Sequence, residues 1–213
     1  MGRVALVAAF AASLLASAAS ANAALVARPV ARAVVLRAAP GGAVVARVSA
    51  KTEFGSPLVF SVTAHRGRWL GVITPSMPNG RLAWIDARTV RTTRLAIRVD
   101  VSLSRRTLTL FERGVVRTRV AVGIGGPSSP TPTGTFAVTD KLSGAGTVYG
   151  CCILALSGHQ PHPRPGWSGS DTRIAIHGGA FGAVSNGCLH AAPGALRFLL
   201  RHVPLGTRVT IRR

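Results

Sequence analysis

The sequence predicts a mainly β protein in two parts, with one short helix close to its C-terminus. Short apolar runs recur along most of the chain and are separated by turn signals built from Gly, Pro and Asn. In the second half, apolar and polar residues alternate with the period of a strand, as where Leu108 and Leu110 alternate with Thr107 and Thr109. The helix is expected at "PGALRFLLRHV", residues 193–203, which starts with proline as helices prefer.

Residues 1–23 have the composition of a secretory signal. Arg3 supplies a short positive start, an apolar stretch follows, and Ala21-Asn22-Ala23 is an A-x-A cleavage site. We expect export to the periplasm or cell-wall space with removal of this segment, and an uncleaved anchor is the alternative. No cysteine lies near the site, so no lipid-modified N-terminus is expected.

The formal charge is +20, with only six acidic residues in the chain. Such a balance often indicates a nucleic-acid partner. An exported protein meets other polyanions first, and the arginines are dispersed at strand-like spacing rather than clustered. We therefore expect no nucleic-acid partner, a cationic solvated surface open to anionic cell-wall polymers, and a monomer.

Residues 30–94 are predicted to form a small all-β module. Five apolar runs are separated by turns such as Pro40-Gly41-Gly42 and Pro78-Asn79-Gly80, which suggests a small barrel. The order of "LRAAPGG", "GRWLGV" and "GRLAWIDARTV" resembles bacterial SH3-like domains. That resemblance implies binding of cell-wall peptide or spacing of the second part from the membrane. A purely structural barrel with Trp69 and Trp84 in its core is the alternative.

Residues 95–213 are predicted to form a second β-rich domain. Three strands are expected before residue 126, with a hairpin turn at Gly114. Further strands are expected at "TFAVTD", "CILALS" and "TRIAIHG", and "PLGTRVTIRR" should close the chain as an edge strand.

Candidate chemistry lies in "IAIHGGAFGAVSNGCLH", residues 174–190. A cysteine in an apolar run is most often a buried hydrophobe. Cys188, however, lies among glycines just before the predicted helix, and His177 ends a clean strand. Nucleophilic catalysis by cysteine needs a thiol, a base and oxyanion donors. Backbone N–H groups of Gly187 and Cys188 are candidates for the last.

The same segment resembles the signature of L,D-transpeptidases (the YkuD-like catalytic domain), in which His-Gly is followed by Ser-x-Gly-Cys. "RTLTLFERGVVRTRVAVGIGG", "PTPTGTF" and "VPLGTRVTI" are similar to other parts of that domain, so the resemblance covers about Ala96 to Arg213. By position it implies Cys188 as the nucleophile and His177 as its acid/base. The carbonyl of Gly178 would orient His177, and Ser185 would shape the substrate pocket.

Two positions depart from the family pattern on the substrate side of the site. Asn186 stands where the family usually has histidine, and His190 where it has arginine or asparagine. We therefore expect altered recognition of the donor carboxylate, with His190 taking over part of that role.

The resemblance implies an activity on peptidoglycan stem peptides. Cys188 would attack the amide after the diamino acid at position three, D-alanine would leave, and an amine of another stem would resolve the thioester into a 3→3 cross-link. Resolution by water would make the protein an L,D-carboxypeptidase, and resolution by a protein lysine would make it an anchoring enzyme. A non-catalytic cell-wall-binding protein is the remaining alternative.

A metal site is a rival interpretation of the same residues. Its possible ligands are Cys151, Cys152, His159, His162, His177, Cys188 and His190. Their spacing matches no standard zinc pattern, so we expect no metal and no cofactor.

The chain has three cysteines, so at least one has no partner within the chain. We expect Cys188 to be a free thiol, and one of Cys151 and Cys152 to be a buried packing residue. A disulfide between these neighbours would close a very small ring and is not expected. A reversible bond from the cleft-facing cysteine to Cys188, acting as an oxidative lock, is the alternative.

Overall fold

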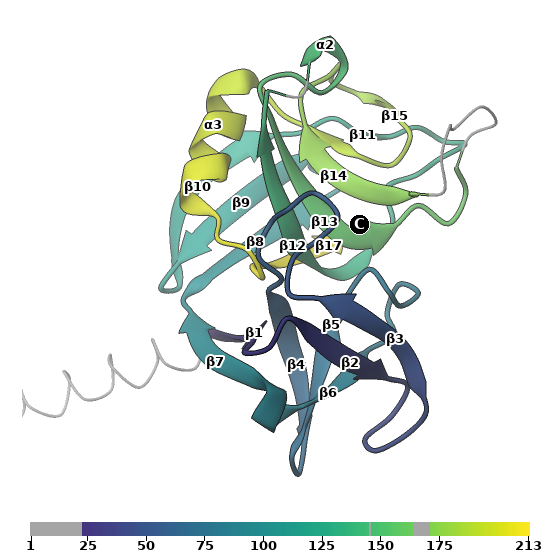
Figure 1. The fold of residues 1–213 in the computed structure, drawn as a ribbon. Helices are drawn as coiled ribbons and strands as arrows, with labels where there is room; N and C mark the ends of the chain where they lie inside the picture. Colours follow the sequence, from purple (N-terminus) through teal and green to yellow (C-terminus); the bar gives the residue numbers. More distant parts are fainter. Residues whose placement is uncertain (1–22, 145, 164–170) are drawn as a thin grey trace, which may run out of the picture.

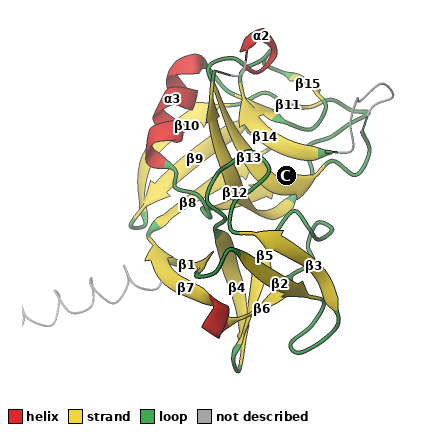
Figure 2. Cartoon of the chain, viewed as in Figure 1, coloured by secondary structure: helices red, strands yellow, loops and turns green. Residues whose placement is uncertain are grey.

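The structure, a computed structural model, describes residues 23–144, 146–163 and 171–213. The predicted signal lies almost wholly outside the described residues. Two large β-sheets follow one another along the chain, the first in the lower half of Figure 1 and the second in its upper half, and helix is scarce (Figure 2). The prediction of a mainly β fold is confirmed. Within the described residues, no helix is long and apolar enough to cross a membrane.

The first sheet has seven strands in the order β3-β2-β6-β5-β4-β1-β7. They are β1 (Ala24–Pro29), β2 (Ala33–Arg37), β3 (Val44–Ser49), β4 (Phe60–Arg66), β5 (Trp69–Ile73), β6 (Ala83–Asp86) and β7 (Val90–Leu95), with a 3-10 turn at Ala87–Thr89 before β7. All five predicted strands are present. The prediction missed β1 and β7, which pair with each other, and β1 also pairs with β4, so the first sheet includes residues from Ala24 onward.

The main core cluster of the front module is aliphatic apart from the ring of Phe60. Leu36, Phe60 and Ile85 are among its fully buried side chains. Trp84 is buried, as the structural-barrel alternative requires, but Trp69 is only partly buried and carries the guanidinium groups of neighbouring arginines over its ring. Trp69 is therefore not a core residue of this module.

The second sheet has eight strands in the order β10-β9-β8-β17-β12-β13-β14-β16. They are β8 (Ile97–Ser102), β9 (Thr107–Glu112), β10 (Val115–Ala121), β12 (Gly134–Ser143), β13 (Cys152–His159), β14 (Arg173–His177), β16 (Leu189–His190) and β17 (Arg208–Arg212). A separate parallel pair consists of β11 (Ile124–Gly125) and β15 (Ala183–Ser185), and α2 (Gly146–Tyr149) is a single turn.

The predicted C-terminal helix is α3 (Pro193–His202), with proline in its first turn. It buries Leu196 and Leu199 and packs against β13. The last strand, β17, was wrongly predicted to lie at an edge. It pairs with β8 on one side and with β12 on the other. Val209 and Ile211 are buried, because both ladders of this strand are occupied and one face lies on the core.

Candidate active site

The parallel pairing of β14 and β16 brings together the two ends of the candidate segment. Ile176 lies opposite Leu189, and His177 lies opposite His190. Cys188 directly precedes β16, so the fold places it beside the last residues of β14. Cys188 and His177 both line one cleft of about 670 Å³. The sequence-predicted nucleophile and base therefore share a single site.

Cys188 is a free cysteine and is 9% exposed. Burial raises the pKa of its thiol to about 11, and a hydrogen bond with the backbone of Ala175 offsets only part of that effect. Loss of water penalises the thiolate more than the neutral thiol. The resting thiol is therefore protonated, and it would need a base in order to act as a nucleophile.

His177 is buried, and its orientation is fixed by its own chain neighbour. Its Nδ1 lies 2.5 Å from the carbonyl oxygen of Gly178, as the resemblance implied. A carbonyl only accepts hydrogen bonds, so Nδ1 carries the hydrogen and Nε2 is left as an acceptor. Burial lowers the pKa of His177 to about 4, with a smaller lowering from His190. The imidazole is neutral at pH 7 and can act as a base.

Two aromatic side chains flank His177, and sequence reasoning missed one of them. The centroid of the His190 ring lies 4.7 Å from that of the His177 ring. The centroid of the Tyr149 ring lies 5.0 Å from that of the His177 ring, in an edge-to-face arrangement. Tyr149 also accepts a hydrogen bond at its carbonyl from the N–H of Gly178, 2.8 Å long. The turn at Tyr149 therefore supports the residue that orients the base. No sequence motif marked this tyrosine.

The loop that carries Cys188 is held by side-chain bonds. The hydroxyl of Ser185 donates to the carbonyl of Cys188 at 2.6 Å and accepts from the N–H of Gly187 at 3.1 Å. Ser185 therefore shapes the nucleophile loop. The Gly187 N–H, a predicted oxyanion donor, is already engaged by that hydroxyl, because Gly187 adopts a left-handed conformation with φ +102° that turns its N–H inward.

A buried glutamine supports the same loop from behind. Gln160 is 2% exposed, and its Nε2 donates to the carbonyls of Pro130 and Asn186 at 3.0 and 3.2 Å. A side chain at Gly187 would collide with this Nε2. The sequence gives no signal for Gln160, because nothing in the chain predicts which loops its amide will join.

Asn186 and His190 both line the cleft, as expected for substrate-side residues. His190 is held by a 2.7 Å hydrogen bond between its Nδ1 and the carbonyl of Ala180, which leaves its Nε2 as the second polar atom of the ring. The side-chain oxygen of Asn186 is buried and has no partner among the described residues. His190 thus has a ring nitrogen available at the cleft, whereas the Asn186 oxygen is not accessible to solvent.

The rest of the cleft is largely apolar. It combines aliphatic residues of the second sheet with two charged residues, and it includes one residue of the front module. Its further lining residues are Phe54, Leu142, Val148, Tyr149, Ile153, Ala155, Asp171, Arg173, Ile174, Ala175, Val184 and Ser185.

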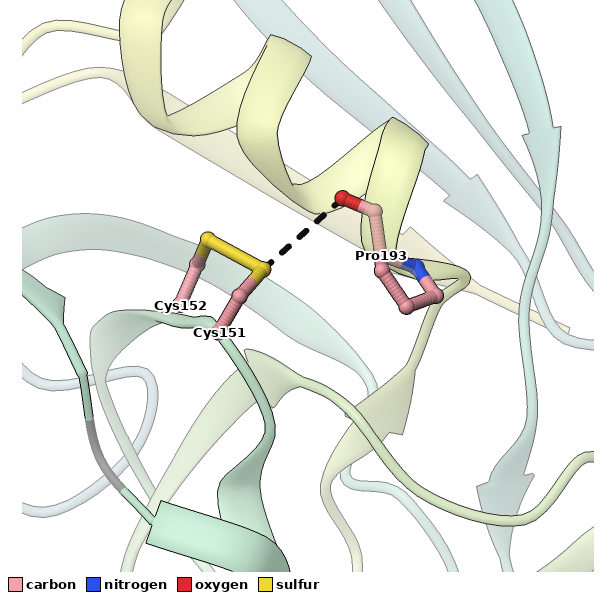
Figure 3. Close-up of a disulfide and its surroundings, with 3 residues drawn as sticks. All are labelled: Cys151, Cys152 and Pro193. Carbon is pink, nitrogen blue, oxygen red and sulfur yellow. Dashed lines mark hydrogen bonds between the residues drawn. A yellow bond between two sulfur atoms is a disulfide. The ribbon is translucent and has the colours of Figure 1, made fainter.

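Cys151 and Cys152 form a disulfide, contrary to the expectation of no bond between them (Figure 3). The expectation assumed that both residues lie on a strand. The strand begins only at Cys152, so Cys151 belongs to the preceding turn and its side chain is not forced to the opposite face. The Sγ of Cys151 lies 3.8 Å from the carbonyl oxygen of Pro193 at the start of α3.

The disulfide leaves Cys188 as the free thiol, which confirms that prediction. Cys152 is 2% exposed and lies in the core, as expected of the inward cysteine. The alternative of a reversible disulfide from Cys188 to Cys151 or Cys152 is not seen, because Cys151 and Cys152 are bonded to each other. Within the described ranges, no three His, Cys, Asp or Glu side chains gather in a group that could hold a metal ion.

Fold and site together define a class of protein. A β sheet carries a buried thiol and a neutral imidazole in one cleft, and these are the groups that acyl transfer through a thioester requires. The chain belongs to the YkuD family of L,D-transpeptidase catalytic domains, whose family model matches residues 96–211. The resemblance inferred from the sequence is confirmed for this part of the chain. The likeness of the front module to SH3-like domains stays a prediction.

Two Bacillus relatives agree with this assignment in sequence. The chain is 32% identical over 114 residues to an L,D-transpeptidase YkuD of Bacillus licheniformis, a match to 54% of the chain and 64% of the relative. The Bacillus subtilis protein of that name is 31% identical over 115 residues, with 54% and 65% covered. The chain thus spans slightly less than two thirds of these relatives. The structure of an Enterococcus faecium L,D-transpeptidase variant is similar at 18% identity and a TM-score of 0.46, with 72% of this chain and 74% of that one covered.

Proposed function

We propose that the protein is an exported L,D-transpeptidase that joins peptidoglycan stem peptides through 3→3 cross-links. The observation that carries the proposal is the shared cleft of Cys188 and His177, in which the imidazole Nε2 is free to accept a proton. Membership of the YkuD family supports the reaction type. Export is proposed from the N-terminal segment, and the sequence of that segment supports it.

In the first half-reaction, Cys188 Sγ attacks the carbonyl carbon of the amide that follows the diamino acid of the donor. The thiol proton passes to Nε2 of His177, and the new C–S bond gives a tetrahedral oxyanion. The C–N bond then breaks, and the proton passes from His177 to the leaving amine of D-alanine. A thioester on Cys188 and a neutral imidazole remain.

In the second half-reaction, the side-chain amine of an acceptor stem attacks the thioester carbonyl. His177 takes a proton from that amine, the C–S bond breaks, and the proton returns to the sulfur. An amide between the two stems forms, and the enzyme regains its thiol. Water in place of the amine would give hydrolysis, and a protein lysine would give anchoring, so the acceptor decides between the three outcomes.

The resting state of this pair is neutral on both sides. Burial stabilises the uncharged thiol and the uncharged imidazole together. Charge therefore develops when the oxyanion forms, and donors for it act in a site of low dielectric. Two backbone N–H groups were predicted as oxyanion donors. Because the N–H of Gly187 is bonded to the Ser185 hydroxyl, the N–H of Cys188 is the remaining candidate.

The test is acylation and product analysis on the purified chain. A carbapenem should add its mass to the wild type, and Cys188→Ala should show no adduct while its circular dichroism is unchanged. His177→Ala should lower the acylation rate by roughly 10²–10⁴, the usual scale of general acid–base catalysis. A tetrapeptide donor with an acceptor stem should yield the 3→3 dimer, whereas release of tripeptide alone would indicate a carboxypeptidase. An adduct on Cys188→Ala would exclude Cys188 as the nucleophile.

A further inference from the structure

A loop of the front module forms part of the wall of the catalytic cleft. The segment 50–59 connects β3 to β4, and Lys51 and Pro57 pair across its base. In Figure 1 this blue segment reaches from the first sheet up to the strands of the second. Phe54 at its tip is 47% exposed and lines the cleft that contains Cys188 and His177. Phe54 is the one lining residue that comes from the front module.

Charged and polar contacts hold this loop against the second sheet. The Thr52 hydroxyl donates to the fully buried carboxylate of Asp140, which belongs to β12. Glu53 forms an ion pair with Arg173, the first residue of β14. The guanidinium of Arg173 also lies over the ring of Phe54, 5.1 Å from its centroid. Three consecutive residues of the loop are thus each fixed by a residue of the catalytic sheet.

Arg173 is held firmly enough to serve as an anchor. Its side chain is 7% exposed and is bonded to Asp171 at 2.6 Å as well as to Glu53, with Asp140 at 3.8 Å. Three of the six acidic residues of the chain surround this one arginine. The protein has a formal charge of +20 and few acidic residues, so the gathering of three of them around Arg173 indicates a specific contact between the loop and the second sheet.

A second contact holds the two parts together at the end of β13. The side chain of Asn79 accepts from the N–H of His159 at 2.8 Å and donates to its carbonyl at 2.6 Å. The His159 ring bonds to the carbonyl of Pro75 at 2.8 Å. The front module is therefore fixed at two places, and Phe54 has a defined position relative to Cys188.

The geometry of β14 sets the distance from Phe54 to the reacting groups. Arg173, Ala175 and His177 line the cleft at every second position of β14, and the buried Ile174 between them also contributes to its lining. Four residue steps at about 3.3 Å separate Arg173 from His177, or about 13 Å along the strand. An extended peptide covers about 3.3–3.6 Å per residue. If the scissile bond of a donor lies at Cys188, the three donor residues before that bond would extend roughly 10 Å toward Arg173.

We propose that Phe54 is a specificity-determining residue for the donor stem, and that it contacts the residues on the N-terminal side of the diamino acid. This inference rests on the proposed function. A stem tetrapeptide has three residues on one side of the scissile bond and one on the other, so only the three-residue side is long enough to approach Arg173 and the Phe54 ring beneath its guanidinium. Leu142, Ile153 and Ala155 are apolar lining residues of the same cleft, and Phe54 adds an aromatic ring from the front module.

The experiment compares donors of different length on Phe54→Ala. With a tetrapeptide donor, the variant should lose roughly tenfold in kcat/KM, the scale of half-burying one aromatic ring. With an N-acetylated dipeptide of the diamino acid and D-alanine, the wild type and the variant should be equal. Carbapenem acylation of Cys188 should also be equal, which shows that the variant is folded and its thiol competent.

Phe181→Ala is the matched control, because Phe181 is 51% exposed and does not line the cleft. It should behave as the wild type with both donors, and Phe54→Leu should restore most of the loss. The inference is overturned if Phe54→Ala matches Phe181→Ala on the tetrapeptide, if its loss is equal for both donors, or if the loss appears in the acceptor KM. A wild type that turns over no stem peptide would instead overturn the proposed function and, with it, this inference.

Discussion

The ring of His190 lies 4.7 Å from the ring of His177, tilted by 53°, because the parallel register of β14 and β16 sets the two residues opposite each other. His190 lowers the pKa of His177 in addition to the larger effect of burial. His190, one of the two residues that we expect to depart from the family pattern, thus influences His177 and also lines the cleft.

Replacing His190 should shift the acid limb of the activity profile. In His190→Ala the pKa of His177 should rise from about 4 toward its ordinary value, because the lowering effect of His190 is removed and water enters. The neutral base would then be lost at a higher pH. The measurement is the rate of carbapenem acylation of wild type and variant in buffers from about pH 3.5 to about pH 7, a range that includes both the lowered and the ordinary pKa. An unchanged acid limb would show that His190 has no electrostatic effect on His177.

The free energy of unfolding should fall at both ends of the pH range because of His177 and Cys188. The pKa of His177 is lowered, so its contribution is complete above the unfolded value of 6.5 and is lost as pH falls through about 4. The pKa of Cys188 is raised, so its contribution is complete below 9.0 and is lost as pH rises through about 11.

Each loss is of order 3 kcal/mol in the free energy of unfolding. Urea titrations of wild type and Cys188→Ala at pH 7 and pH 10.5, as assay settings, separate the alkaline part. The variant should lose less stability than the wild type between these two conditions, because it has no thiol to ionise on unfolding. Equal losses would show that another group causes the alkaline change.

A side chain at Gly187 should disorganise the nucleophile loop. Gly187 has φ +102°, and a Cβ there would collide with Nε2 of Gln160. Gly187→Ala should therefore cost about 1–3 kcal/mol of stability and lower the acylation rate sharply. Gly194→Ala is the matched control, since no heavy atom lies within 4 Å of a Cβ added at Gly194 in α3. Similar behaviour of the two variants would mean that the loop does not depend on Gly187.

The disulfide between Cys151 and Cys152 predicts a defined thiol count. Denatured wild type should show one reactive thiol, from Cys188, and three after reduction by a dithiol. The bond directly follows the turn of Tyr149 and Gly150, which packs against Gly178. The double change of Cys151→Ser with Cys152→Ser should therefore slow acylation without removing Cys188. Three thiols before reduction would contradict the disulfide.

Local patterns were sufficient to predict most strands. Alternation identified β8, β9 and β10, and the run "TRIAIH" identified β14 with His177 at its end. Proline at the first position identified α3. The position of a strand within its sheet could not be predicted in this way. Strand β17 pairs with β8, which lies far earlier in the chain. The alternation of apolar and polar residues in these two strands does not specify which strand pairs with which.

The sequence by itself determined the family of the second domain, since the motif that contains His177 and Cys188 consists of residues close together in the chain. Only the tertiary structure decided their electrostatics, the engagement of Gly187 by Ser185, the bond between Cys151 and Cys152, and the approach of Phe54 to the cleft. The physical reason is range. A motif is defined by neighbours along the chain, whereas burial, hydrogen-bond partners and cleft walls depend on residues that become neighbours only through folding.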